Sequence, residues 1–189
     1  MTFPLPASGG SMLHRLVIVE THPIQYKAPL FRKLAADPRL DLTVLYALEP
    51  DPAQQGAGFG VPFAWDVPLR EGYRSEVLEN RARRPSATTF CGCDTPGIGR
   101  RLRELRPDAV LVNGWVAKTC LQALWACRRL GIPCLVRGEA NLLRPRVAWK
   151  HALHGLLLRQ YDAFLAIGSA NRDFYRFHRR SENRIFWSP

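Results

Sequence analysis

Short, uninterrupted apolar segments alternate with helical patterns along most of this chain. Residues 109–112 read AVLV and residues 163–167 read AFLAI, without the polar–apolar alternation of a half-exposed strand. Strands of this kind are buried on both faces, as in a parallel sheet covered by helices. Residues 133–136 form a third such strand, and helical patterns over 117–130 and 146–160 separate the three. Because parallel strands need crossover connections of this length, the pattern predicts an α/β fold with a parallel sheet.

The same alternation extends to both ends of the chain. The remaining elements are predicted as strands at 16–20, 40–46 and 184–187 and as helices at 28–36, 98–105 and 170–177. Together they predict a Rossmann-like, doubly wound parallel sheet flanked by helices. For 189 residues, we expect one domain over 12–189, preceded by a disordered tail over 1–11.

One long segment interrupts this regularity. Residues 49–94 hold much of the proline and glycine of the chain, and within them only residues 63–69 are predicted as a strand. A connection of that length is uncommon in a compact domain and is often functional.

The chain is strongly basic, with a formal net charge of +11 and a sequence pI of about 10.1. This excess is typical of solvated helix faces and also of proteins that bind an anionic partner such as phosphate groups, a membrane surface or nucleic acid. The arginines are spread over clusters at 81–84, 100–103, 128–129 and 179–180. No helix-turn-helix or RNA-recognition motif accompanies them, so the sequence does not favour nucleic-acid binding.

The segment 144–159 is basic and partly apolar. Such a helix is found on anionic membrane surfaces, but the commoner arrangement, which we favour here, is a core helix with a solvated basic face. Within it His151 and His154 are too isolated to be assigned as ligands. No apolar run reaches the ~20 residues needed to span a bilayer.

Five cysteines and no recognisable secretion signal indicate a reducing, cytoplasmic setting. Cys91 and Cys93 form a CxC pair, which is not the spacing of a zinc knuckle, and we expect no metal site. Cys120 and Cys127 lie on one face of the helix predicted at 117–130, where small buried hydrophobic residues fit.

Ligands of a doubly wound sheet bind in the crevice at the carboxyl ends of its strands. The first strand-to-helix turn, over residues 20–26, contains no glycine and therefore does not match the GxGxxG loop of dinucleotide-binding proteins. Its polar side chains instead favour a ligand held by side-chain hydrogen bonds. Four such loops converge on one edge and carry His22, Gln25 and Tyr26; Asn113, Gly114 and Trp115; Arg137, Glu139 and Asn141; and Gly168 and Ser169.

Each of these residues also has a purely structural interpretation. His22 is placed to cap the following helix, and Arg137 and Glu139 are close enough in sequence to form an ion pair. Trp115 suits the core as well as stacking on a sugar or another ring. No nucleophile motif, Walker A loop or HExxH pattern is present, so no catalytic residue is assigned.

Four ordered segments carry a resemblance: THPIQYKAPLFRKLAADPRLDLTVLY, FAWDVPLREGYRSEVLEN, DAVLVNGW and LVRGEANLL. They resemble the N-terminal half of family 4 glycosyltransferases, which have the GT-B fold. The resemblance implies two Rossmann-like domains facing across a cleft, an acceptor-binding domain first and a donor-binding domain second. Residues 12–189 would then be the N-terminal domain, and the donor domain is expected to be absent from this chain.

The resemblance also implies the ligands. Members are metal-independent, have no cofactor besides the nucleotide-sugar co-substrate, and transfer sugar to a glycan or a lipid-linked acceptor. They are usually cytoplasmic, often working at the inner membrane face and in polysaccharide biosynthesis, which suggests peripheral contact with an anionic membrane. Because the donor domain is expected to be absent, a separate donor-domain subunit is a further expected partner. Residues expected to line the acceptor side are His22, Gln25, Tyr26, Trp65, Asp66, Tyr73, Asn113, Gly114, Trp115, Arg137, Glu139 and Asn141.

Two functions from different classes therefore remain open. The first is the acceptor-binding domain of a glycosyltransferase, inactive without its donor-binding half. The second is a non-catalytic Rossmann-like module that binds an anionic glycan or a phosphate-bearing partner.

Overall fold

The computed structural model describes residues 13–49, 68–143 and 145–189. Within them a parallel sheet comprises β1 His14–Glu20, β2 Leu40–Tyr46, β3 Arg74–Val77, β4 Ala109–Asn113, β5 Cys134–Arg137, β6 Ala163–Ala166 and β7 Ile185–Trp187. The strand order is β3-β2-β1-β4-β5-β6-β7, and every neighbouring pair is parallel. This is the doubly wound order, with its reversal point between β1 and β4.

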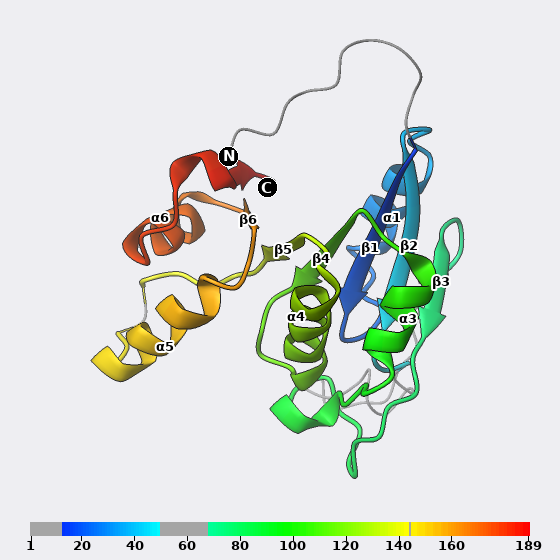
Figure 1. Ribbon diagram of the computed structural model, residues 1–189, viewed down its shortest axis with the longest axis horizontal. Coiled ribbons are helices and arrows are strands. Elements are labelled where there is room, and N and C mark those ends of the chain that lie inside the picture. Colours follow the sequence, from blue (N-terminus) through cyan, green and yellow to red (C-terminus); the bar gives the residue numbers. More distant parts are fainter. Residues whose placement is uncertain (1–12, 50–67, 144) are drawn as a thin grey trace.

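The helices are α1 Ala28–Ala35, α3 Ile98–Leu105, α4 Lys118–Leu130, α5 Ala148–Leu158 and α6 Ser169–Phe177, with short 3-10 turns at Phe90–Gly92 and Glu182–Arg184. They lie along the sheet with α1 near β1 and β2, and with α5 and α6 towards the opposite end (Figure 1). Local signals explain the ends of two of them. Pro29 occupies the first turn of α1, and α4 ends at Gly131, whose φ of +68° suits a glycine.

Apolar residues fill both sides of the sheet. On one side, Val112 of β4 and Val136 of β5 pack with residues of α3, α4, α5 and α6 in one large buried cluster. On the other side, Ile18 of β1 and Val44 of β2 pack against Phe31 of α1. The central strands β1, β2 and β4 are thus buried on both faces, whereas β5 and β6 are fully buried on one face and partly buried on the other. The parallel sheet flanked by helices confirms the predicted fold class.

The structure corrects one part of the predicted element list. Most of the strand predicted at 63–69 lies outside the described residues, whereas β3 at Arg74–Val77 was not predicted. Its sequence RSEV is mostly polar, and among the described residues the strand pairs with β2 alone. An edge strand of this kind carries no continuous apolar run, so it lacks the signal that identified the others.

Cys120, Cys127 and Cys134 are buried in the larger cluster, as the predicted helix face implies for the first two. No helix in the described part of the chain has the length and apolar character needed to cross a membrane.

Candidate functional site

A buried ion pair occupies the glycine-free turn at the end of β1. Glu20 is only 2% exposed, and Lys27 Nζ at the start of α1 donates to both of its carboxylate oxygens at 2.9 and 2.8 Å. The side-chain amide of Asn113, at the end of β4, donates to the same carboxylate. The two strands at the reversal point of the sheet are therefore joined at their carboxyl ends by side chains.

The pKa of Glu20 is raised overall, because burial outweighs the effect of its partners. Burial raises the pKa of Glu20, whereas the charge and hydrogen bonds of Lys27, then the amide of Asn113 and the charge of Arg137, act to lower it. A buried carboxylate depends on its partners to stay ionised. The hydrogen bonds that Lys27 and Asn113 donate to Glu20 therefore also hold these two side chains in place.

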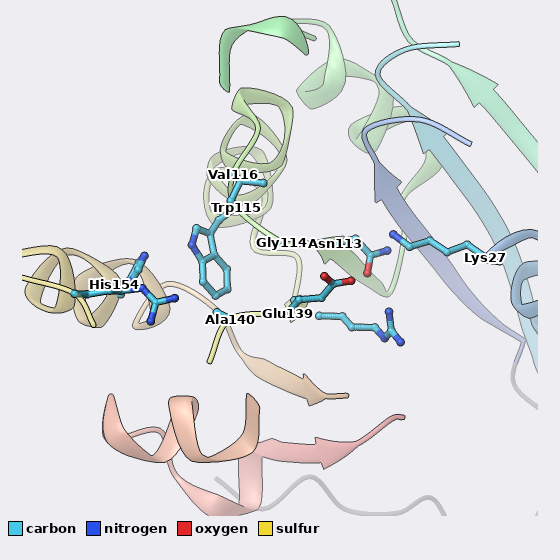
Figure 2. A pocket seen from close by; sticks show the side chains of 11 residues that line it. Lys27, Asn113, Gly114, Trp115, Val116, Glu139, Ala140 and His154 are labelled. Carbon is cyan, nitrogen blue, oxygen red and sulfur yellow. The ribbon is translucent and has the colours of Figure 1, made fainter. Parts of the chain in front are cut away.

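A cavity of about 450 Å³ opens beside this ion pair, at the carboxyl ends of β4 and β5 (Figure 2). Lys27 and Asn113 lie towards one end of it, and Trp115 and His154 lie towards the other. The cavity is lined by Lys27, Asn113, Gly114, Trp115, Val116, Arg137, Gly138, Glu139, Ala140, Arg146 and His154. Its position agrees with the general rule that doubly wound sheets bind ligands at this edge.

Arg137 is the last residue of β5, and its side chain lines the cavity. The Nε atom is buried and makes no hydrogen bond within the described part of the chain. The Arg137 carbonyl accepts a hydrogen bond from the N–H of Gly114 at 2.7 Å, and Gly114 has a φ of +84°. Glycine is needed there because other residues are strained in that conformation. A buried guanidinium nitrogen without a partner is a ready donor to an anionic or polar ligand.

Trp115 satisfies both of the interpretations that the sequence left open. Its ring stacks on Phe174 with ring centroids 6.1 Å apart, and it meets the His154 ring edge-on at 5.8 Å. The same side chain lines the cavity. A ring held in this way on one side presents a rigid apolar wall to a ligand on the other.

The loop after β5 is held in place by α6. The Asn171 side chain is buried, donates to the carbonyl of Ala140 at 2.7 Å, and accepts from the N–H of Ile167 at 3.2 Å. Asn141 makes local hydrogen bonds to the backbone of Glu139 and Leu143. The loop that carries Glu139 is therefore an ordered wall of the cavity.

Five of the residues predicted for the site are brought together in the cavity lining: Asn113, Gly114, Trp115, Arg137 and Glu139. Arg137 and Glu139 form no ion pair among the described residues; the Arg137 Nε atom has no hydrogen-bond partner there, and Glu139 is exposed. Both charged groups are thus available to a ligand.

Other predicted residues do not line this cavity. Gln25 and Tyr26 are exposed, and Asn141 supports the neighbouring loop. His22 is half-buried with Nδ1 2.9 Å from the hydroxyl of Thr21; burial, followed by the charge of Lys27, lowers its pKa.

The His22 side chain makes no capping hydrogen bond to α1, which has no side-chain cap. The hydroxyl of Tyr73 shares a hydrogen bond with that of Tyr46 at 2.8 Å, and the Tyr73 ring packs edge-on against Phe31 of α1. Trp65 and Asp66 lie outside the described residues.

Sequence reasoning did not find the full lining. Lys27 was missed, although a signal existed: the lone acid Glu20 at the end of a buried strand needs a cationic partner nearby. Arg146 reaches the cavity from the loop just before α5, and His154 reaches it from the inward face of α5, both far in sequence from the strand ends. His151 and His154 looked isolated because their partners, Phe177 and Trp115, come from other elements.

The lining is equipped for binding more clearly than for bond cleavage. Glu139 is its one carboxylate among the described residues, so no pair of carboxylates faces the cavity. No group of three or more His, Cys, Asp or Glu side chains in the described ranges could hold a metal ion. Three cationic side chains, an amide and an aromatic wall suit a polar ligand that bears negative charge.

Comparison with known proteins identifies the fold. No protein-family model and no curated protein match the chain. The structure of Anabaena Alr3699/HepE in complex with UDP and glucose is similar with a TM-score of 0.56 and 12% identity, covering 92% of this chain and 43% of that one. The UDP-N-acetylglucosamine 2-epimerase of Rickettsia bellii is similar with a TM-score of 0.56 and 15% identity, covering 93% of this chain and 44% of the enzyme.

The chain therefore spans less than half the length of these solved structures. At such identities the likeness concerns the fold. The chain has the Rossmann-like fold of one half of the GT-B architecture.

Proposed function

We propose that this chain is the acceptor-binding part of a glycosyltransferase and that the cavity at the ends of β4 and β5 holds the acceptor. The acceptor would be a glycan or a lipid-linked sugar, received on the cytoplasmic side. The nucleotide-sugar donor would bind to a second domain or to a separate donor-domain subunit. Transfer would then depend on both parts closing over the acceptor hydroxyl and excluding water.

One observation carries this proposal: the cavity combines a rigid aromatic wall with the Nε atom of Arg137, which is unpartnered among the described residues. Trp115 offers an apolar face of the kind that packs against sugar rings. The Arg137 Nε atom is buried without a partner, and Asn113 is fixed beside it at the neighbouring strand end. The glycine-free turn after β1 is filled by the pair of Glu20 and Lys27, which supports an acceptor more than a nucleotide diphosphate at this edge.

Titration calorimetry on the purified 189-residue chain tests the proposal. The ligands are a water-soluble, short-chain prenyl-diphosphate sugar, a neutral oligosaccharide and UDP. We expect saturable binding of at least one of the two acceptor types, with UDP at least tenfold weaker. The Arg137→Met variant should bind a phosphate-bearing ligand about 10- to 100-fold more weakly, because a charge-assisted hydrogen bond contributes roughly 1.5–3 kcal/mol.

Arg103→Met is the matched control, because Arg103 is an exposed arginine of α3 that does not line the cavity. Its affinity should equal that of the unmodified chain. UDP binding more tightly than every acceptor, with loss in Arg137→Met, would show that the cavity is a donor site and would overturn the proposal.

The unpartnered Arg137 nitrogen and the net charge of +11 also favour a second candidate. A non-catalytic module would bind an anionic glycan or a phosphate-bearing partner in the same cavity, with strong salt dependence. Sugar transfer separates the two functions. Co-expression with a donor-domain partner that associates stably should produce transfer under the first and none under the second.

A further inference from the structure

Helix α5 faces outward with its large apolar residues. Trp149, Leu153 and Leu156 are 64%, 56% and 57% exposed. Their spacing of i, i+4 and i+7 places them on one stripe of the helix. The sequence favoured a core helix with a solvated basic face, and the structure corrects this. Of the residues of α5, only Leu158 is buried.

The inward face of α5 is already packed by histidines. His151 lies 5.5 Å from the ring of His178 and 4.9 Å from that of Phe177, between ring centroids. His154 lies 5.8 Å from Trp115 at the cavity. Rotating the helix to bury its apolar stripe would expel these rings. The outward stripe is thus a consequence of specific packing.

The surroundings of this stripe are cationic. Residues 140–161 contain no aspartate or glutamate, but they contain three arginines and one lysine. Lys150 Nζ lies 5.5 Å from the centroid of the Trp149 ring. Neither Lys150 nor Arg159 forms an ion pair within the described part of the chain. An apolar stripe with unpaired cations beside it is complementary to a surface that offers both acyl chains and negative charge.

We propose that the outward stripe of α5 docks on an anionic lipid surface. Trp149, Leu153 and Leu156 would enter the boundary between headgroups and acyl chains, and Lys150 and Arg159 would contact lipid phosphates. A protein partner fits less well, because lysine is depleted in protein interfaces and this stretch supplies no acid for a charge pair. The arrangement in Figure 1 leaves α5 at the end of the molecule opposite β3.

This docking surface stands apart from the proposed function, since it rests on a different face of α5. His154 points from the same helix to the cavity, as Figure 2 shows. If both proposals hold, the cavity lies close to the bilayer, where a lipid-linked acceptor resides.

Vesicle flotation with the full 189-residue chain tests the docking. One vesicle preparation contains phosphatidylcholine with 30% phosphatidylglycerol, and the other contains phosphatidylcholine alone. We expect binding to the anionic vesicles that weakens with salt, and little binding to the neutral ones. The double variant W149A/L153A should bind at least tenfold more weakly. Lys150→Gln should bind about fivefold more weakly, because each basic residue near an anionic surface contributes about 1 kcal/mol.

The matched control is Trp125→Ala. Trp125 of α4 is 49% exposed and lies among the arginines Arg100, Arg103 and Arg129, but it has no exposed apolar stripe beside it. Vesicle binding by this variant should equal that of the unmodified chain. All the substituted side chains are exposed, so urea unfolding should show that each variant folds normally.

Several results would overturn the docking proposal. One is absence of binding to anionic vesicles; another is an equal loss in Trp125→Ala and in W149A/L153A. If soluble glycerophosphoglycerol competes with vesicle binding, and if Arg137→Met is the one variant that loses vesicle binding, then lipid binding belongs to the cavity. Failure to bind vesicles combined with a dimer that W149A/L153A dissociates would identify a second copy of the chain as the occupant.

Discussion

Removing Lys27 should destabilise the fold more than any loss of an exposed charge. The Lys27→Met substitution keeps most of the side-chain volume but leaves the Glu20 carboxylate, which is 2% exposed, without its cation. Breaking a buried ion pair in this way costs about 3–5 kcal/mol. This is a large part of the 5–15 kcal/mol that stabilises a typical domain. Of its present side-chain donors, Glu20 would keep the Asn113 amide.

The pH dependence of this loss has a definite sign. Burial already raises the pKa of Glu20, and removing Lys27 raises it further. Between the unfolded-state pKa of about 4.3 and the raised folded-state value, the native state binds more protons than the unfolded state. Stability of Lys27→Met therefore falls as the pH rises through that window. The deficit should be smallest near pH 4 and largest at neutral pH or above.

Urea unfolding of a double-mutant cycle with Glu20→Gln measures the effect. Lys27→Met should lose about 3 kcal/mol or more at pH 7, and the double variant should lose clearly less than the sum of the single losses. Arg39→Met, which breaks an exposed pair with Asp37, is the control and should change little. A loss below about 1 kcal/mol for Lys27→Met, or strictly additive losses, would refute the reasoning.

Three further predictions concern the supports of the cavity. Burial, reinforced by neighbouring histidines, lowers the pKa of His178 to about 4, so the unfolded state binds more protons than the folded state between about pH 6.5 and 4. The free energy of unfolding in urea should therefore fall by about 1–3 kcal/mol as the pH drops through this window. The His178→Gln variant should show a smaller fall over the same pH range. Gly114→Ala, at a φ of +84°, should lower stability by about 1–2 kcal/mol in thermal unfolding, and an unchanged midpoint would contradict the strain. Asn171→Ala leaves the carbonyl of Ala140 and the N–H of Ile167 without their side-chain partner, and should cost about 1–3 kcal/mol and speed hydrogen exchange in residues 138–143.

The strands that were predicted share one physical property. The segment 109–112 is apolar throughout because the sheet is buried on both faces at β4, and 163–167 is apolar because one face of β6 is buried and the other is partly buried, so composition alone reveals them. Arg74–Val77 at the sheet edge has no such requirement, and its strand depends on backbone pairing with β2. Backbone pairing leaves no mark on side-chain composition, so this strand could not be predicted.

The edge of the sheet that carries the cavity could be predicted, but its exact lining could not. Strand ends identify Asn113, Trp115 and Arg137 because parallel topology brings them to one edge. The rotation of α5 decides whether Trp149 or His154 faces the cavity, and the helix has apolar residues on several sides. Its orientation is set by aromatic contacts to other elements, which no local pattern encodes.

The glycine-free turn after β1 also explains where the cavity lies. In a dinucleotide-binding sheet, glycines leave the space at the first turn open for a pyrophosphate. Here Lys27 folds back onto Glu20, and Asn113 closes the pair from β4, so side chains fill that space. The open volume begins one strand further along, between the ends of β4 and β5, where Arg137 has an unpartnered nitrogen. Lys27 and Asn113 therefore both exclude a backbone-bound diphosphate and build one wall of the cavity. For this reason Lys27→Met should lower both the stability of the fold and the affinity of the cavity for its ligand.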